Sequence, residues 1–238
     1  GPGPRRLRGA RMILQPTPKE IKTALKDWVP SDLLVFRPGW KTRGRPWIYG
    51  IRGNMCHHWS GTGDGGQAWM EQRGTSEYPY CNATIRRGTD SSRDGQIMVI
   101  SALSAWHSGA GGPWGRAGVP KDLAHLMVWG TEMEGPLAVN RQKFEDSDGR
   151  VRIDDMTDKQ WESLAQLNCA LRQVAGQEAF PNFQRVVTHA DWTDGTAGVA
   201  AFTLPTVGRK NDVWRDTRTV RRDAKRLWNS RIDRKASA

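Results

Sequence analysis

The chain has 238 residues, 37% hydrophobic and 8% aromatic, which is enough length and apolar material to bury a full core. The sequence has no run of about 20 apolar residues, so we expect no membrane-spanning helix. The formal net charge of +11 indicates a polyanionic partner, and nucleic acid and an anionic cell wall fit this charge equally well.

Predicted helices and strands alternate in the first part of the chain. An irregular, proline-rich leader precedes TPKEIKTALKDWVP, where Ile21, Leu25 and Trp28 recur at helical spacing. DLLVF and GNMCHHW are typical of strands, and the loop between them is basic and rich in glycine and proline. CNATIRR and GQIMVIS predict a hairpin that flanks GTDSSRDG, and LMVWGTEME predicts another strand.

The clearest helix is predicted over residues 157–175. Thr157 and Gln160 form a capping box at its start, apolar residues follow at helical spacing, and Gly176 stops it. FQRVVTH then predicts a strand that ends at His189, and VWRDTRTVRRDAKRLWNSRIDRK predicts a helix rich in arginine. Strands interleaved with helices indicate an α/β domain.

The histidines are the first candidates for chemistry, because an imidazole ring can bind a metal or move a proton. His57 and His58 end one predicted strand and His189 ends another, and strand ends in α/β folds are where sites gather. A catalytic zinc needs three protein ligands and an open position for water. Two strand-end histidines supply two ligands, so the third must be a nearby Asp, Glu or Cys.

Five short motifs follow one another along the chain: CHHWSG, AWHSG, WGTEMEG, VVTHADW and GRKND. Together they resemble the zinc-dependent N-acetylmuramoyl-L-alanine amidases of the peptidoglycan-recognition and phage-lysozyme superfamily, in particular the phage endolysin type. The resemblance covers roughly residues 45–215. It implies a central mixed β-sheet flanked by helices, a Zn²⁺ cofactor, and hydrolysis of the amide bond between N-acetylmuramic acid and L-alanine in peptidoglycan.

The resemblance assigns the zinc ligands to His57, His189 and Asp212. Trp59 stands where the family pattern has threonine, so His58 remains open as the alternative to His57. The segment between the second and third ligands is longer than the family pattern leads us to expect.

The resemblance also assigns the remaining catalytic groups. Glu132 is the expected general base, and Glu134 stays open because residues two apart on a strand share a face. Lys210 is expected to stabilise the oxyanion of the tetrahedral intermediate. Three further side chains are expected to contact the substrate: His107, Tyr80 and Asn82.

Several of these assignments have a plainer alternative. Tyr80 and Asn82 could equally be packing residues, Trp106 is expected to pack in the core, and His125 is expected to be structural. Two other classes of function also remain open: a metal-dependent nucleic-acid enzyme or binder, suggested by the charge, and a non-catalytic peptidoglycan-binding module. The chain has no recognisable nuclease or nucleic-acid-binding motif and keeps every candidate ligand, so we expect neither.

The chain is expected to divide into three parts: residues 1–30, a leader and short helix; residues 31–215, the zinc amidase catalytic domain; and residues 216–238, a basic helix or tail. Between Arg215 and Lys235, nine Arg or Lys residues stand against three Asp residues, which predicts attraction to anionic cell-wall polymers. The alternative is a solvated helix with Trp214 and Leu227 packed inward.

The expected biological setting follows from the resemblance and from the start of the chain. GPGPRRLRGARM has no apolar segment typical of a signal peptide. We therefore expect a monomer that is made in the host cytoplasm and acts on the wall after release, as a phage or prophage endolysin. A cytoplasmic recycling amidase remains the alternative.

Overall fold

A central sheet organises the molecule in the computed structural model, which describes residues 15–48, 50–59, 63–72, 79–108, 114, 117–135, 144–145, 151–152, 156–176, 180–183, 186–188 and 217–236. The strands of this sheet lie in the order β1-β4-β3-β5-β2-β8. They are β1 (Leu34–Phe36), β2 (Asn54–Trp59), β3 (Ala83–Arg87), β4 (Asp94–Val99), β5 (Trp129–Glu134) and β8 (Val186–Thr188).

Within this sheet only the β3–β4 hairpin is antiparallel, and the other neighbouring strands run parallel. The expected α/β class with a central mixed sheet is therefore confirmed. Two short strands, β6 (Phe144–Glu145) and β7 (Val151–Arg152), pair with each other in a separate sheet.

Within the described residues, four α-helices flank the sheet: α1 (Pro18–Trp28), α2 (Gly63–Gln72), α3 (Asp158–Ala175) and α5 (Thr217–Ala236). Short 3₁₀ turns lie at Ser31–Leu33, Ala124–Leu126 and Pro181–Phe183. Thr17 and Thr157 begin α1 and α3 with complete capping boxes, which satisfy backbone N–H groups that have no partner inside the helix. No described helix combines the length and the apolar composition that crossing a bilayer requires.

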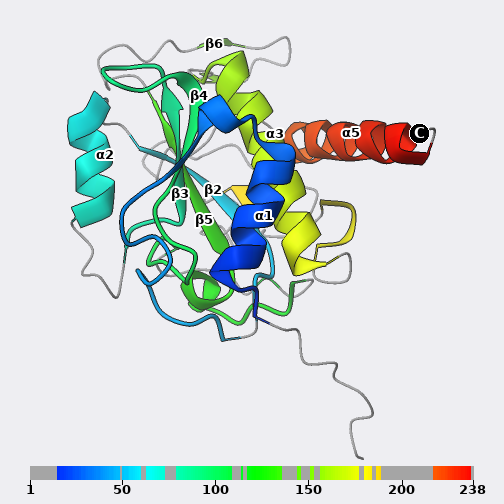
Figure 1. Cartoon of the computed structure of the whole chain (residues 1–238), viewed down its shortest axis with the longest axis horizontal. Helices are drawn as coiled ribbons and strands as arrows, with labels where there is room; N and C mark the ends of the chain where they lie inside the picture. Colours follow the sequence, from blue (N-terminus) through cyan, green and yellow to red (C-terminus); the bar gives the residue numbers. More distant parts are fainter. Residues whose placement is uncertain are drawn as a thin grey trace, which may run out of the picture.

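The two faces of the sheet are covered by different elements, and Figure 1 shows α1 and α3 on one side and α2 on the other. Side chains alternate between the two faces along each strand. On the α3 side, Cys56, Ile85 and Met133 join the main core with Leu164 of α3. On the other side, Met55 and Val187 pack in a second cluster with Trp114.

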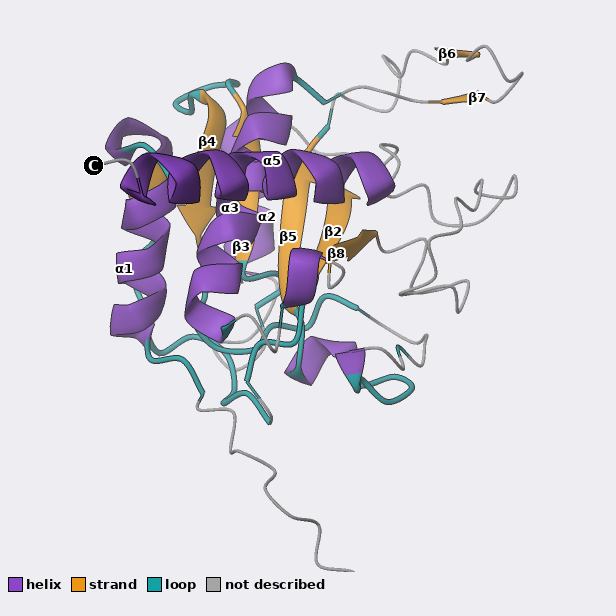
Figure 2. Ribbon diagram, turned by 90° about the vertical axis from the view of Figure 1, so that its right-hand side faces the viewer, coloured by secondary structure: helices purple, strands orange, loops and turns teal. Residues whose placement is uncertain are grey.

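The basic C-terminal helix α5 packs against α3. Figure 2 shows it running across the direction of the strands. Val220 and Ala224 are buried in the main core, and Leu227 is partly buried against it, as expected for the packed-helix alternative. Trp214 lies outside the described residues.

Aromatic rings make packing contacts between α5 and the helices α1 and α3. Trp228 of α5 stacks on Trp28 of α1, with ring centroids 5.1 Å apart and planes 12° from parallel. The Arg172 guanidinium lies 4.5 Å from the Trp228 ring centroid, and the Arg231 guanidinium lies 4.3 Å from that of Trp28. Such cation–π contacts contribute about 0.5–2 kcal/mol each. At least one positive charge of α5, that of Arg231, therefore contacts an aromatic ring of the same fold.

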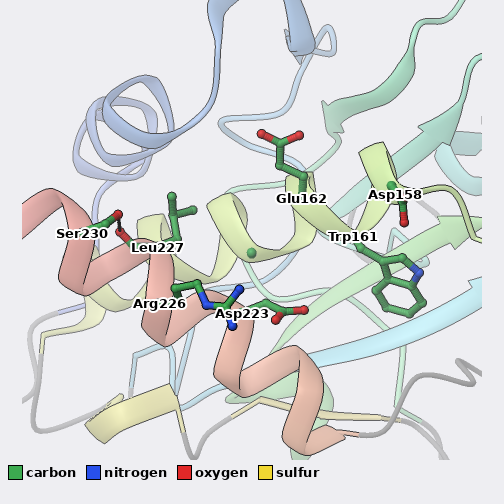
Figure 3. Close-up of a pocket in the computed structure, with 8 residues that line it drawn as sticks. Asp158, Trp161, Glu162, Asp223, Arg226, Leu227 and Ser230 are labelled. Atoms are coloured by element: carbon green, nitrogen blue, oxygen red, sulfur yellow. Dashed lines mark hydrogen bonds between the residues drawn. The ribbon is translucent and has the colours of Figure 1, made fainter.

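A groove of about 400 Å³ lies between side chains of α3 and α5 (Figure 3). Asp158, Trp161 and Glu162 of α3 and Asp223 and Arg226 of α5 line it. It lies on the α3 side of the sheet, whereas the histidine site described below lies on the opposite face.

Candidate functional site

The adjacent histidines of β2 point to opposite faces of the sheet. His57 is in register with Glu132 of β5, and His58 with Met133. Met133 belongs to the main core on the α3 side, so His58 shares that face and His57 points the other way. A side chain on Gly135 would collide with the His58 ring. His58 therefore lies on the α3 side of the sheet and His57 on the opposite side.

A second histidine contacts His57 on this opposite side of the sheet. Nε2 of His57 lies 3.1 Å from Nδ1 of His107, and both side chains are buried. Nε2 of His107 lies 2.7 Å from the carbonyl oxygen of Val128. Gly130 of β5 makes this possible, since a Cβ at that position would collide with the His107 ring. The sequence predicts a substrate contact for His107, whereas the structure places it directly against His57.

Glu132 completes this group from the neighbouring strand. Its Oε1 atom lies 4.0 Å from Nδ1 of His57, which is too long for a hydrogen bond. The Glu132 side chain is 13% exposed, whereas that of His57 is 2% exposed. The motifs CHHWSG, AWHSG and WGTEMEG therefore meet at one place, with a carboxylate at its solvent side.

Glu134 lies two residues further along β5 in a completely different environment. It is fully buried and its carboxylate accepts hydrogen bonds from Arg86 Nε (2.8 Å), Thr89 Oγ1 (2.5 Å), Gly63 N (2.5 Å) and Arg87 N (2.9 Å). Burial raises the pKa of Glu134, but these hydrogen bonds outweigh it and hold the pKa below its usual value. Glu134 therefore joins β5, β3 and the start of α2 as a structural anion.

The two other residues expected to contact substrate differ sharply. Asn82 is fully buried: its Nδ2 donates to the carbonyls of Ser101 (3.3 Å) and Leu103 (2.5 Å), and its Oδ1 accepts from Gly130 N at 2.8 Å. This geometry favours the packing alternative for Asn82. Tyr80 is partly exposed and stacks on Trp69 with ring centroids 4.7 Å apart, so it remains accessible.

Two exposed tryptophans are features that the sequence did not indicate. Trp106, expected in the core, is 49% exposed and packs against His125 with centroids 4.3 Å apart, so that prediction is wrong. Trp69 is 42% exposed beside Tyr80. Trp106 directly precedes the buried His107, so one residue faces solvent and the next faces His57. No hydrophobic periodicity surrounds either tryptophan, so the sequence carried no signal for their exposure.

Three predicted residues, His189, Lys210 and Asp212, lie outside the described residues. The last described residue of β8, Thr188, is in register with Cys56, the residue before His57. Among the residues that the structure does describe, no group of three or more His, Cys, Asp or Glu side chains is arranged to hold a metal ion.

Comparison with known proteins gives a distant structural likeness. No family model and no curated protein matches the sequence. Two crystal structures of AmpDh3 from Pseudomonas aeruginosa, one in complex with an anhydromuramic pentapeptide, are similar with a TM-score of 0.43 and 19% identity. The likeness covers 60% of this chain and 51% of the matched chain, about half its length. At this TM-score it carries no conclusion about function.

Proposed function

We propose that the protein is a zinc-dependent N-acetylmuramoyl-L-alanine amidase, which hydrolyses the bond between N-acetylmuramic acid and L-alanine in peptidoglycan. The meeting of His57, His107 and Glu132 on one face of the sheet is the observation that supports this best. Three of the five motifs that carry the family resemblance supply these residues, although they are far apart in the sequence. A buried histidine pair beside a partly exposed carboxylate suits metal-assisted hydrolysis.

His57, His189 and Asp212 are the proposed zinc ligands. Nδ1 of His57 lies 4.0 Å from Oε1 of Glu132 on the neighbouring strand, and an imidazole nitrogen is a donor that zinc accepts. His189 follows Thr188, the last described residue of β8, and this strand pairs in parallel with β2, which carries His57. Bound zinc would lower the pKa of a coordinated water and polarise the scissile carbonyl.

The chain's own residues would then divide the remaining work. Glu132, at the solvent side of His57, is proposed to accept the proton of the attacking water. Lys210 is proposed to stabilise the negative charge on the carbonyl oxygen. Tyr80, partly exposed on its Trp69 platform, is proposed to contact the substrate.

We also propose the biological setting of a phage or prophage endolysin that acts on the host wall after release. Arg222, Lys225 and Arg226 are exposed on α5, and the chain carries a net charge of +11. These exposed charges would hold the enzyme, as a monomer, on anionic wall polymers.

The proposal is tested by digesting purified peptidoglycan with the protein and detecting new L-alanine amino termini. Zinc content is measured in wild type, His57→Ala and His58→Ala. We expect one zinc per chain and amidase activity in wild type, and neither in His57→Ala. Zinc bound by His57→Ala but lost from His58→Ala would show that the wrong ring was chosen.

A plasmid-nicking assay run in parallel separates the alternatives. Nicking without wall digestion would replace the amidase with a nucleic-acid enzyme. Wall binding with zinc but without new amino termini would indicate a non-catalytic recognition module.

A further inference from the structure

The hydrogen bonds of His107 determine which of its ring nitrogens carries a proton. Its Nε2 atom lies 2.7 Å from the Val128 carbonyl oxygen. A carbonyl oxygen can only accept a hydrogen bond, so Nε2 of His107 must be the donor. A neutral imidazole carries a single N–H, and Nδ1 of His107 is therefore an acceptor.

The contact between the two rings also fixes the position of the proton on His57. Nδ1 of His107 lies 3.1 Å from Nε2 of His57, and an acceptor there requires His57 to donate from Nε2. The lone pair of a neutral His57 is then on Nδ1. That atom faces Oε1 of Glu132 at 4.0 Å, so two electron-rich atoms converge at the solvent side of the pair.

We infer that His107 is a positioning residue: anchored by the Val128 carbonyl, it fixes His57 as the Nε2–H tautomer and so presents Nδ1 of His57 to a divalent cation. Only the identification of this cation as the zinc of a hydrolytic site rests on the proposed function. The tautomers themselves do not depend on it. The role differs from the substrate contact that the resemblance implies for His107.

The surroundings hold both rings in these orientations. His57 and His107 are 2% and 7% exposed, so water competes little for their ring nitrogens. Gly130 leaves room for the His107 ring, which a Cβ would displace. Partners that orient a metal-binding histidine in this way change metal affinity by about 10- to 100-fold when they are removed.

The first test measures tautomers in the full-length, metal-free protein. Long-range ¹H–¹⁵N NMR spectra of ¹⁵N-histidine-labelled protein, recorded at about pH 8, distinguish a protonated ring nitrogen from an unprotonated one. We expect His57 and His107 both to carry the proton on Nε2. A proton on Nδ1 of either ring would overturn the inference, whether or not the protein hydrolyses peptidoglycan.

Zinc titration of the same sample adds a second result. We expect the unprotonated Nδ1 resonance of His57 to shift on coordination while His107 keeps its Nε2–H form. Direct coordination of His107 Nδ1 would overturn the inference, because His107 would then be a ligand itself.

Two matched substitutions of His107 test whether the hydrogen-bond acceptor at its Nδ1 position supports zinc binding. His107→Asn keeps a carbonyl oxygen near the position of Nδ1, whereas His107→Gln keeps a donor near the position of Nε2 and loses that acceptor. We expect zinc to bind about 10- to 100-fold more weakly to His107→Gln, with affinity partly restored in His107→Asn. His125→Gln, a change in a histidine outside this pair, should bind zinc like wild type. Unchanged zinc affinity in His107→Gln would overturn the inference, and if both variants fail to fold, the wild-type tautomers still decide it.

Discussion

The two carboxylates of β5 lie two residues apart on the same face of one strand, and their surroundings give them opposite properties. Glu134 is fully buried and held by donors from three segments, whereas Glu132 lies at the solvent side of His57. The first belongs to a closed region built around Arg86. The second belongs to a region that is partly exposed at Glu132 and at Trp106, the residue before His107, and that we call the open region. A buried, fully bonded carboxylate stabilises a fold, while an accessible one beside a histidine can exchange protons.

The largest effect is expected in the open region. Glu132→Gln removes the proposed proton acceptor with little change in shape, so kcat should fall by about 10²- to 10⁴-fold. Zinc content and the thermal unfolding transition should stay as in wild type. Turnover of a soluble muramoyl-peptide is the measurement, and a variant with wild-type turnover would remove Glu132 from the mechanism.

A substitution in the closed region should lower the stability of the protein. Glu134→Ala removes the buried carboxylate from the fully buried Arg86 guanidinium and leaves it only the exposed Asp64 carboxylate at 3.2 Å, which should lower the free energy of unfolding by about 3–5 kcal/mol. Chemical denaturation provides the measurement. The double variant Arg86→Met/Glu134→Leu should recover much of this loss, since it removes both charges together. A single variant as stable as wild type would contradict the anchoring role.

The loss of stability at acidic pH should also depend on Glu134. The folded-state pKa of Glu134 lies below its usual value of 4.5, so the folded protein binds fewer protons than the unfolded chain. This contribution to stability is fully present above about pH 4.5 and is lost as pH falls through the folded-state pKa. Denaturation at a series of pH values should therefore show that the free energy of unfolding falls more steeply with acid in wild type than in Glu134→Ala. Equal slopes would show that Glu134 does not supply the effect.

Trp106 offers a smaller test of the open region. Its exposed ring could pack on a bound substrate, so Trp106→Ala should raise KM about 2- to 10-fold and leave kcat nearly unchanged. Trp28→Ala is the control, because Trp28 packs against α5 on the other side of the sheet. That control should alter stability instead. A fall in kcat alone for Trp106→Ala would contradict a binding role.

The smallest effect is expected on α5. Arg222→Gln/Lys225→Gln removes two exposed charges without disturbing the packed residues Val220 and Ala224. Binding to isolated walls should weaken about 2- to 5-fold at low salt, with a flatter salt dependence. Sedimentation of the protein with walls measures this, and an unchanged salt profile would remove α5 from wall binding.

Local signals in the sequence predicted most of the regular structure. The capping boxes at Thr17 and Thr157 predicted the starts of α1 and α3, and the hairpin of β3 and β4 was also expected. Helix α2 was missed because its sequence, GDGGQAWMEQ, contains three glycines, which disfavour a helix. Here tertiary contacts such as the hydrogen bond from Thr84 Oγ1 to Gln67 Oε1 outweigh local propensity.

The site was less predictable, because its alternatives depend on distant residues. The rings of His57 and His58 can be assigned to their two faces of β2 only once the position of α3 is known. Glu132 and Glu134 share a face, so they are distinguished by donors from other segments that bind Glu134, such as Arg86 on β3 and Gly63 at the start of α2. The contact between His57 and His107 joins residues 50 positions apart and has no local signature.

Chelation tests the central claim most directly. The rate at which the protein cleaves a soluble N-acetylmuramoyl-L-alanyl peptide is measured before chelation, after removal of metal, and after addition of Zn²⁺. We expect cleavage between the sugar acid and L-alanine, loss of the activity on chelation, and its return with about one Zn²⁺ per chain. Cleavage that survives complete removal of metal, or a zinc-loaded protein that leaves this bond intact, would contradict this expectation.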